Sequence, residues 1–179
     1  MSFEQPANCE ELLNYRIARL LSVSGALLIR LCEGRFGISR REWRLIAMLA
    51  DYGTLAPSEL ARRAHTDRPR VSRAISNLVD KGLVSRGDGG EGRHRAAVSL
   101  TDKGRTLHAE LFPLTASINT RILTALEPEE IQALDRALNA LTCAAEELNQ
   151  TYPLKEKADR RNGGSRQFAS SRPDLLDVW

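Results

Sequence analysis

Arginine, asparagine and serine side chains recur along one side of a helix that the sequence predicts over residues 69–81. On a helical wheel Arg70, Arg73 and Asn77 fall together, beside Ser72 and Ser76. An arginine can bind O6 and N7 of guanine with two hydrogen bonds, and one helix fits the major groove of DNA. Hydroxyl groups next to it can contact phosphates. This side therefore has the chemistry to read duplex DNA; the alternative is an ordinary solvated face with two arginines.

The opposite side of the same helix is apolar and predicts a core contact. It consists of Val71, Ala74, Ile75 and Leu78. Pro69 suits the first helical position, because that residue needs no intrahelical donor, and Gly82 suits the C-terminal stop. A short helix expected over 59–64 precedes it. The pair predicts a helix-turn-helix, in which the second helix enters the groove.

A basic hairpin is expected directly after this helix. Residues 83–86 and 96–100 have strand character, and a glycine-rich turn at 87–92 separates them. Arg93, His94 and Arg95 follow the turn, so a guanidinium can project from a narrow loop towards the negative potential of the minor groove. Arg93 and Arg95 are both candidates for that position. The alternative is a hairpin whose charges only keep it soluble.

Four further helices are expected around this unit. Apolar residues at spacings of three and four predict a long helix over 10–31, and Ser39 with Glu42 forms a capping box for the next, over 39–49. Residues 101–126 form another, kinked at Pro113, and 127–150 the last, in which Cys143 is expected to be buried. The first and last helices have apolar faces too long for one small core, so they should pair with a second subunit.

These expectations define a mainly α protein with a small β wing. Residues 37–104 form a winged helix-turn-helix, residues 8–36 and 105–150 form helical dimerisation regions, and residues 153–179 form a mobile basic tail. Residues 62–105 contain eleven Lys and Arg and five Asp and Glu. This segment therefore has a net charge of +6 in a chain whose net charge is +3. Such a concentration is typical of a surface that meets a polyanion.

Composition and missing motifs disfavour several other classes of protein. Aromatic residues make up only 5% of the chain, which disfavours binding of single strands by base stacking. Three widely spaced cysteines favour a reducing cytoplasm over a disulfide framework, and no stretch predicts a signal peptide or membrane span. No phosphate loop, HExxH or GxSxG motif is present, so we expect no catalytic residues, no metal site and no cofactor.

The combined pattern resembles the MarR family of bacterial transcriptional regulators. The resemblance covers residues 38–105 and is carried by Val71-Ser72-Arg73 with Leu78, by Lys81-Gly82-Leu83-Val84, and by Leu100-Thr101-x-x-Gly104. It implies a homodimer that binds a near-palindromic operator of double-stranded DNA with one recognition helix and one wing per half-site. It also implies repression that a small, often aromatic, acid relieves by binding between the dimerisation and DNA-binding regions.

Two sets of contact residues follow. The residues expected at DNA are Ser58, Arg68, Arg70, Ser72, Arg73, Ser76, Asn77, Arg86, Arg93, His94 and Arg95. The residues expected at an effector are Tyr15, Arg16, Arg19 and Trp43, because an arginine beside aromatic walls suits a carboxylate on a ring. The alternative places Trp43 in the core and both arginines in solvent or in salt bridges between subunits.

A redox-sensing regulator of the same fold is the closest alternative. It would use Cys9, near the start of the first helix, or Cys32, near its end. A reactive thiol needs an electropositive, partly exposed setting. A protein-interaction module or an enzyme is disfavoured, since the basic residues of 62–105 would then have no role.

Overall fold

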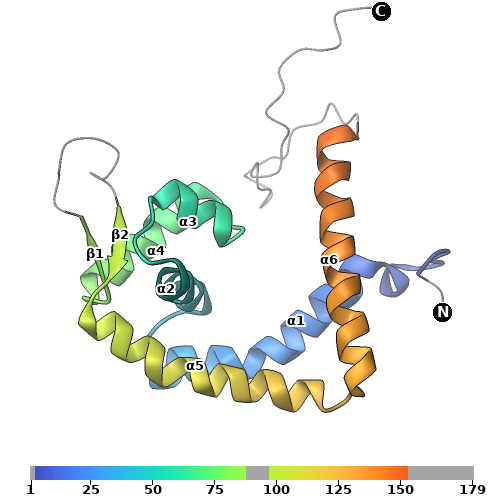
Figure 1. Ribbon diagram of the computed structural model, residues 1–179, viewed down its shortest axis with the longest axis horizontal. Coiled ribbons are helices and arrows are strands. Elements are labelled where there is room, and N and C mark those ends of the chain that lie inside the picture. The colour runs from blue at the N-terminus through green and yellow to red at the C-terminus, as the bar shows by residue number, and fades with distance from the viewer. Residues whose placement is uncertain (1–2, 88–96, 153–179) are drawn as a thin grey trace, which may run out of the picture.

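The structure is a computed structural model that describes residues 3–87 and 97–152. Its helices and strands are α1 (Leu13–Arg30), α2 (Arg40–Tyr52), α3 (Pro57–Arg63), α4 (Arg68–Asp80), β1 (Val84–Arg86), β2 (Val98–Leu100), α5 (Asp102–Leu123) and α6 (Pro128–Thr151). Short 3-10 and π-helical turns flank α1 at Cys9–Glu11 and Leu31–Arg35. In Figure 1, α2, α3, α4 and the two strands gather into one lobe, α1 and α5 run beneath it, and α6 stands apart. None of the helices in the described part could span a membrane.

The lobe has a closed hydrophobic core. The predicted apolar side of α4 is confirmed, because Val71, Ala74, Ile75 and Leu78 are all buried. They pack with α2, both strands and Leu111 of α5. The core thus fixes which side of α4 faces outward.

Two strands and one isolated bridge form the wing root. β1 and β2 are antiparallel, with Ser85 opposite Ser99. Leu55, in the loop before α3, exchanges two backbone hydrogen bonds with Val98, at 3.0 and 2.8 Å. The strands therefore hold the loop before α3 against the wing.

Local capping sets the helix boundaries. The capping box of Ser39 and Glu42 is confirmed at the start of α2, and Thr101 caps α5. The predicted start of the recognition helix was wrong by one residue. Helix α4 begins at Arg68 because the Asp67 carboxylate accepts the Arg70 N–H at 3.0 Å, which places Pro69 at the second position.

Two residues of the MarR-like segments, Lys81 and Gly104, have structural roles. Lys81 reaches back to Glu42 of α2, with Nζ 2.9 Å from Oε2, and the Glu42 side chain is only 4% exposed. Gly104 lies so close to the strand that an added Cβ would be 2.0 Å from the Leu83 carbonyl oxygen. These two residues join α2 to α4 and α5 to the wing root.

The outer helices have no such core. No residue of α6 is buried over its whole length, and Gly25 is the one buried residue of α1. Cys143 was predicted to be buried, and that is wrong for the single chain, because the helix around it contacts too little of the lobe. Helix α5 continues through Pro113 to Leu123.

Candidate nucleic-acid interface

The outward side of α4 carries the polar side chains predicted for it. Ser72, Arg73, Ser76 and Asn77 are exposed, as is Arg68 at the first position. Arg70 is half-buried, and its Nε lies 3.1 Å from Asp67 Oδ2. This pair keeps the Arg70 guanidinium at the helix start. Arg73 forms no such pair within the described residues, so its guanidinium is available to a base edge.

Arg86 joins the wing to the recognition helix. It ends β1 and donates from Nη2 to the Ser76 hydroxyl at 3.1 Å, while that hydroxyl donates to the Ser72 carbonyl at 3.2 Å. Three of the residues expected at DNA therefore lie together at the junction of helix and wing. Ser58 lies apart from them, exposed at the second residue of α3.

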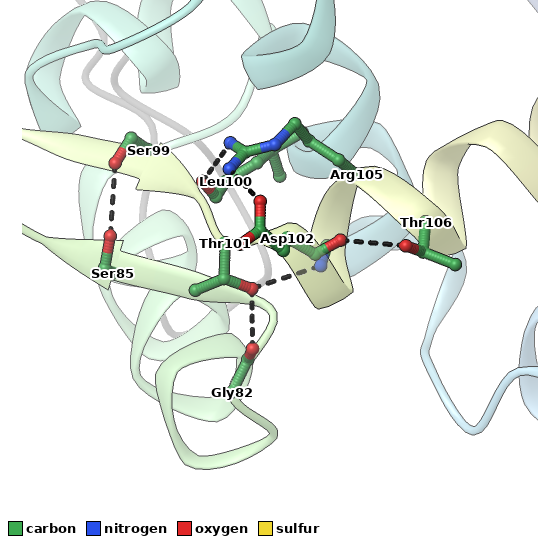
Figure 2. Close-up of polar contacts among 9 residues, drawn as sticks. Gly82, Ser85, Ser99, Leu100, Thr101, Asp102, Arg105 and Thr106 are labelled. Atoms are coloured by element: carbon green, nitrogen blue, oxygen red, sulfur yellow. Dashed lines mark hydrogen bonds and ion pairs between the residues drawn. The ribbon is translucent and has the colours of Figure 1, made fainter.

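The base of the wing is held firmly to α5 (Figure 2). Ser85 and Ser99 join the strands at 3.1 Å, and the Thr101 hydroxyl donates to the Gly82 carbonyl at 2.7 Å. Arg105 binds both the Leu100 carbonyl and the Asp102 carboxylate, at 2.8 and 2.5 Å. The wing thus cannot turn at its root without breaking these bonds. The predicted tip residues Arg93, His94 and Arg95 lie outside the described residues.

Some basic residues near the interface are already neutralised. Glu59 of α3 pairs with Arg62 at 2.6 Å and with Arg63 at 2.7 Å. The hydrogen bond from Arg62 lowers the pKa of the Glu59 carboxyl to about 2, so it stays ionised at neutral pH. Arg63 also lies over the Tyr52 ring, 3.9 Å from its centroid. Part of the +6 charge of residues 62–105 therefore serves local structure.

An apolar cavity of about 330 Å³ lies between α1, α2 and α5. Trp43, predicted as an effector contact, lines it and is also a core residue at 7% exposure, stacked on His108 at 5.4 Å. Tyr15, Arg16 and Arg19 line none of the cavities described here, and Arg16 lies over the Phe3 ring. We refer to this cavity as the effector pocket, after the effector site that the sequence predicts around Trp43.

The arginines of the effector pocket are Arg40 and Arg44, whereas the sequence predicts Arg16 and Arg19. Arg40 lies against the backbone of α1, where a Cβ on Gly25 would come within 2.5 Å of its Nη1. Arg44 donates from Nη1 to the Ala64 carbonyl at 3.2 Å. Their position one turn apart at the start of α2 was the available signal, but nothing local indicated that they face α1.

The thiols do not favour a redox sensor at Cys32. This residue is fully buried, and its burial, with the nearby Glu33 carboxylate, raises the pKa of the thiol to about 11. A thiol that stays protonated at neutral pH is a poor nucleophile. Cys9 is exposed in the turn before α1.

The fold and this interface define a winged helix-turn-helix protein with long helical arms. Comparison with known proteins supports this class. Residues 36–94 match the MarR family. The regulator FarR of Neisseria gonorrhoeae is 34% identical over 74 residues, which are 41% of this chain and 51% of FarR.

Solved structures extend the likeness beyond the winged unit. A MarR family regulator of Silicibacter pomeroyi superposes with a TM-score of 0.65 at 26% identity, over 76% of this chain and 99% of that chain. NadR, in complex with 4-hydroxyphenylacetate, superposes with a TM-score of 0.66 at 25% identity, over 76% and 99%. These likenesses identify a MarR-type winged helix-turn-helix protein, a DNA-binding transcriptional regulator by similarity.

Proposed function

We propose that this regulator is a homodimeric repressor that leaves a near-palindromic operator when a small aromatic acid binds. The observation that carries the DNA-reading part is the division of α4 into a buried apolar side and an exposed side with Arg73 and Asn77. Arg73 is proposed to read a base edge. The proposed DNA contacts are Ser58, Arg68, Arg70, Ser72, Arg73, Ser76, Asn77 and Arg86, with Arg93, His94 and Arg95 at the wing tip.

A second copy of the chain is the proposed partner of the outer helices. Leucines at spacings of three and four along α6 are 40–57% exposed, among them Leu134, Leu138 and Leu141. Soluble monomers rarely expose so long an apolar face. A dimer with two-fold symmetry also places two α4 helices on one DNA face, which a near-palindromic operator requires.

An aromatic acid suits the effector pocket. Its walls are mostly apolar and include Leu21, Leu28 and Ile118, while Arg40 and Arg44 offer guanidinium groups for a carboxylate. NadR, a relative by fold and sequence, is known with 4-hydroxyphenylacetate. Trp43 supplies an aromatic wall. The proposed place of action is the cytoplasm.

The test of the DNA-reading part uses Arg73→Ala on a duplex that the wild-type protein selects from a random pool. Loss of a two-bond arginine contact costs about 1–3 kcal/mol per base pair read, and a dimer loses it twice, so affinity should fall at least about thirty-fold. Fluorescence anisotropy at several salt concentrations measures this. Arg121→Ala, an exposed arginine of α5, removes the same charge as the control.

The two variants separate the outcomes. Arg121→Ala should keep the wild-type affinity, and both variants should remain dimers by light scattering. If Arg73→Ala kept its affinity for the selected duplex, α4 would not be the reading element. If neither variant nor the wild-type protein showed a dependence of affinity on salt, the DNA-binding role itself would be wrong.

A further inference from the structure

A second cavity, of about 470 Å³, lies beside the effector pocket. It is formed by the end of α1, the start of α2 and the turn between α3 and α4. Four of its wall residues are arginines, Arg40, Arg41, Arg44 and Arg70, and two are carboxylates, Glu33 and Asp67. Four formal positive charges against two negative charges give these residues a formal net charge of +2. We refer to this cavity as the arginine cavity.

The pairing of these arginines leaves part of their charge uncompensated. Arg70 is paired with Asp67, and Arg44 donates to the neutral Ala64 carbonyl. Within residues 3–87 and 97–152, neither Arg40 nor Arg41 has a hydrogen-bond acceptor or an ion-pair partner. Two guanidinium groups without an anion thus line one concave site.

The geometry of the donors favours a tetrahedral oxyanion. Guanidinium groups bind oxyanions with two parallel hydrogen bonds, and several groups around one site suit more than one charge. The Ser39 hydroxyl, also in the wall, accepts from the Glu42 N–H at 3.2 Å, so its own proton is free to donate. We propose that the arginine cavity is a binding site for a phosphate-class oxyanion, either inorganic phosphate or the phosphate group of a small molecule.

Binding there would act on the recognition helix. Arg70, a proposed DNA contact, is part of the wall, so a bound dianion competes with DNA phosphates for its guanidinium. Arg44 holds the Ala64 carbonyl, which also accepts the Thr66 hydroxyl at 3.1 Å just before the Asp67 cap of α4. An anion that draws Arg44 away loosens this turn. This effect on DNA rests on the proposed function, whereas anion binding itself does not.

Arg40 and Arg44 line both cavities, so the phosphate has two possible sources. A free phosphate ion would occupy the arginine cavity alone. A phosphate monoester with an aromatic group would place its ring in the effector pocket and its phosphate among the arginines. The test compares these sources directly.

The experiment is calorimetric titration of the dimer, without DNA and at constant ionic strength, with inorganic phosphate and with phenyl phosphate. Arg41→Gln removes a cavity arginine that lines no wall of the effector pocket, and Arg121→Gln is the control of equal charge. We expect saturable binding to the wild-type protein and to Arg121→Gln. Binding by Arg41→Gln should be at least about tenfold weaker, because a charge-assisted contact is lost. Its unfolding temperature without ligand should match that of the control.

Each outcome decides the proposal. Saturation by inorganic phosphate supports a site for the free ion, and saturation by phenyl phosphate alone supports a site for the phosphate of a larger effector. No saturation by either compound, or equal weakening in both variants, would overturn the site. Phosphate binding that leaves the DNA affinity of the wild-type protein unchanged would overturn the competition with DNA.

The same titrations distinguish failure of this proposal from failure of the proposed function. Titration with 4-hydroxyphenylacetate probes the effector pocket, and Arg41→Gln should leave it unchanged. Binding of that acid without binding of phosphate refutes the arginine cavity alone. Binding of phosphate without binding of the acid refutes the aromatic effector alone.

Discussion

The winged lobe and the outer helices are built from similar amphipathic sequence but differ in what covers their apolar sides. In the lobe, Ile46, Leu78 and Val98 are fully buried. In α6, Leu138 and Leu148 keep 45% and 57% of their surface exposed. A helix with an apolar stripe must bury it somewhere, and among residues 3–87 and 97–152 the chain provides that cover in the lobe but not along α6. The difference separates a region that buries its own apolar side from one whose apolar side the proposed second subunit would cover.

The largest effect should come from charging the uncovered side of α6. Leu138→Glu combined with Leu141→Glu places carboxylates in the proposed dimer interface, which should give monomers in sedimentation velocity. Operator affinity should then fall about 10²–10⁴-fold, because two linked half-site contacts become separate ones.

The control adds the same charge on the opposite side of α6, as Gln132→Glu with Asn139→Glu, and should remain dimeric. Folded monomers of the Leu138 and Leu141 variant would support the view that the lobe buries its own apolar side while α6 needs a partner. A dimer that persists in the Leu138 and Leu141 variant would mean that α6 is not the interface.

The next largest effect should be in the lobe, at Gly104. An added methyl group would overlap the Leu83 carbonyl, so Gly104→Ala forces α5 away from the wing root. We expect a loss of about 3 kcal/mol or more in the free energy of unfolding, measured in urea, because backbone atoms cannot move aside cheaply. Gly34→Ala, where the Cβ would meet no atom within 4 Å, is the control and should change stability by less than about 1 kcal/mol. Equal effects in the two variants would contradict this contact.

A moderate effect is expected at the Glu42–Lys81 pair. Burial raises the pKa of the Glu42 carboxyl, but hydrogen bonds from Ser39 and Lys81 outweigh it, so the pKa in the folded protein is below its ordinary 4.5. A carboxyl with a lowered pKa stabilises the fold above the unfolded value and loses this contribution as pH falls through the folded value. Stability should therefore decline below about pH 4.5.

Lys81→Met tests this pair. It leaves the buried carboxylate without its cation and should cost about 1–3 kcal/mol at pH 7. Since the lowered pKa partly depends on Lys81, the loss of stability between pH 5 and pH 3 should become smaller. Thermal unfolding across this pH range gives the comparison, with Lys103→Met as a control on a lysine that donates to the Lys81 carbonyl at 2.8 Å. An unchanged pH profile in Lys81→Met would refute the role of the pair.

The smallest effect is expected where the two regions meet, at Gly25 of α1. Alanine there should stabilise the helix slightly, but its methyl group must displace the Arg40 guanidinium, which is the flexible end of a side chain. We expect binding of 4-hydroxyphenylacetate to weaken several-fold in Gly25→Ala with no loss of unfolding temperature. Arg40→Gln should weaken binding at least as much. Unchanged affinity in both would exclude Arg40 as the carboxylate partner.

Much of the fold could be predicted because its signals are local. The capping box at Ser39, the glycine after α4 and the apolar spacing of Val71, Ala74 and Leu78 all act within a few residues. The outward side of α4 follows directly from them. The predicted start of α4 was wrong because Pro69 also suits the first helical position. The cap at Asp67 instead makes Arg68 the first residue and Pro69 the second.

Contacts between distant segments could not be predicted in this way. Glu42 and Lys81 are separated by 39 residues, and no local pattern pairs them. The pocket arginines were expected on α1, at Arg16 and Arg19, because an amphipathic helix shows which residues are polar but not what lies opposite them.

Sequence alone thus determined the helices, the wing strands and the side of α4 that faces outward, since backbone periodicity and capping are properties of short segments. Tertiary structure alone decided which guanidinium groups meet at a cavity. Arg40 and Arg44 reach both cavities because α1, α5 and the turn before α4 pack around the start of α2. The physical reason is that a cavity is made by the side chains of several elements, and its charge is set by where they are brought together.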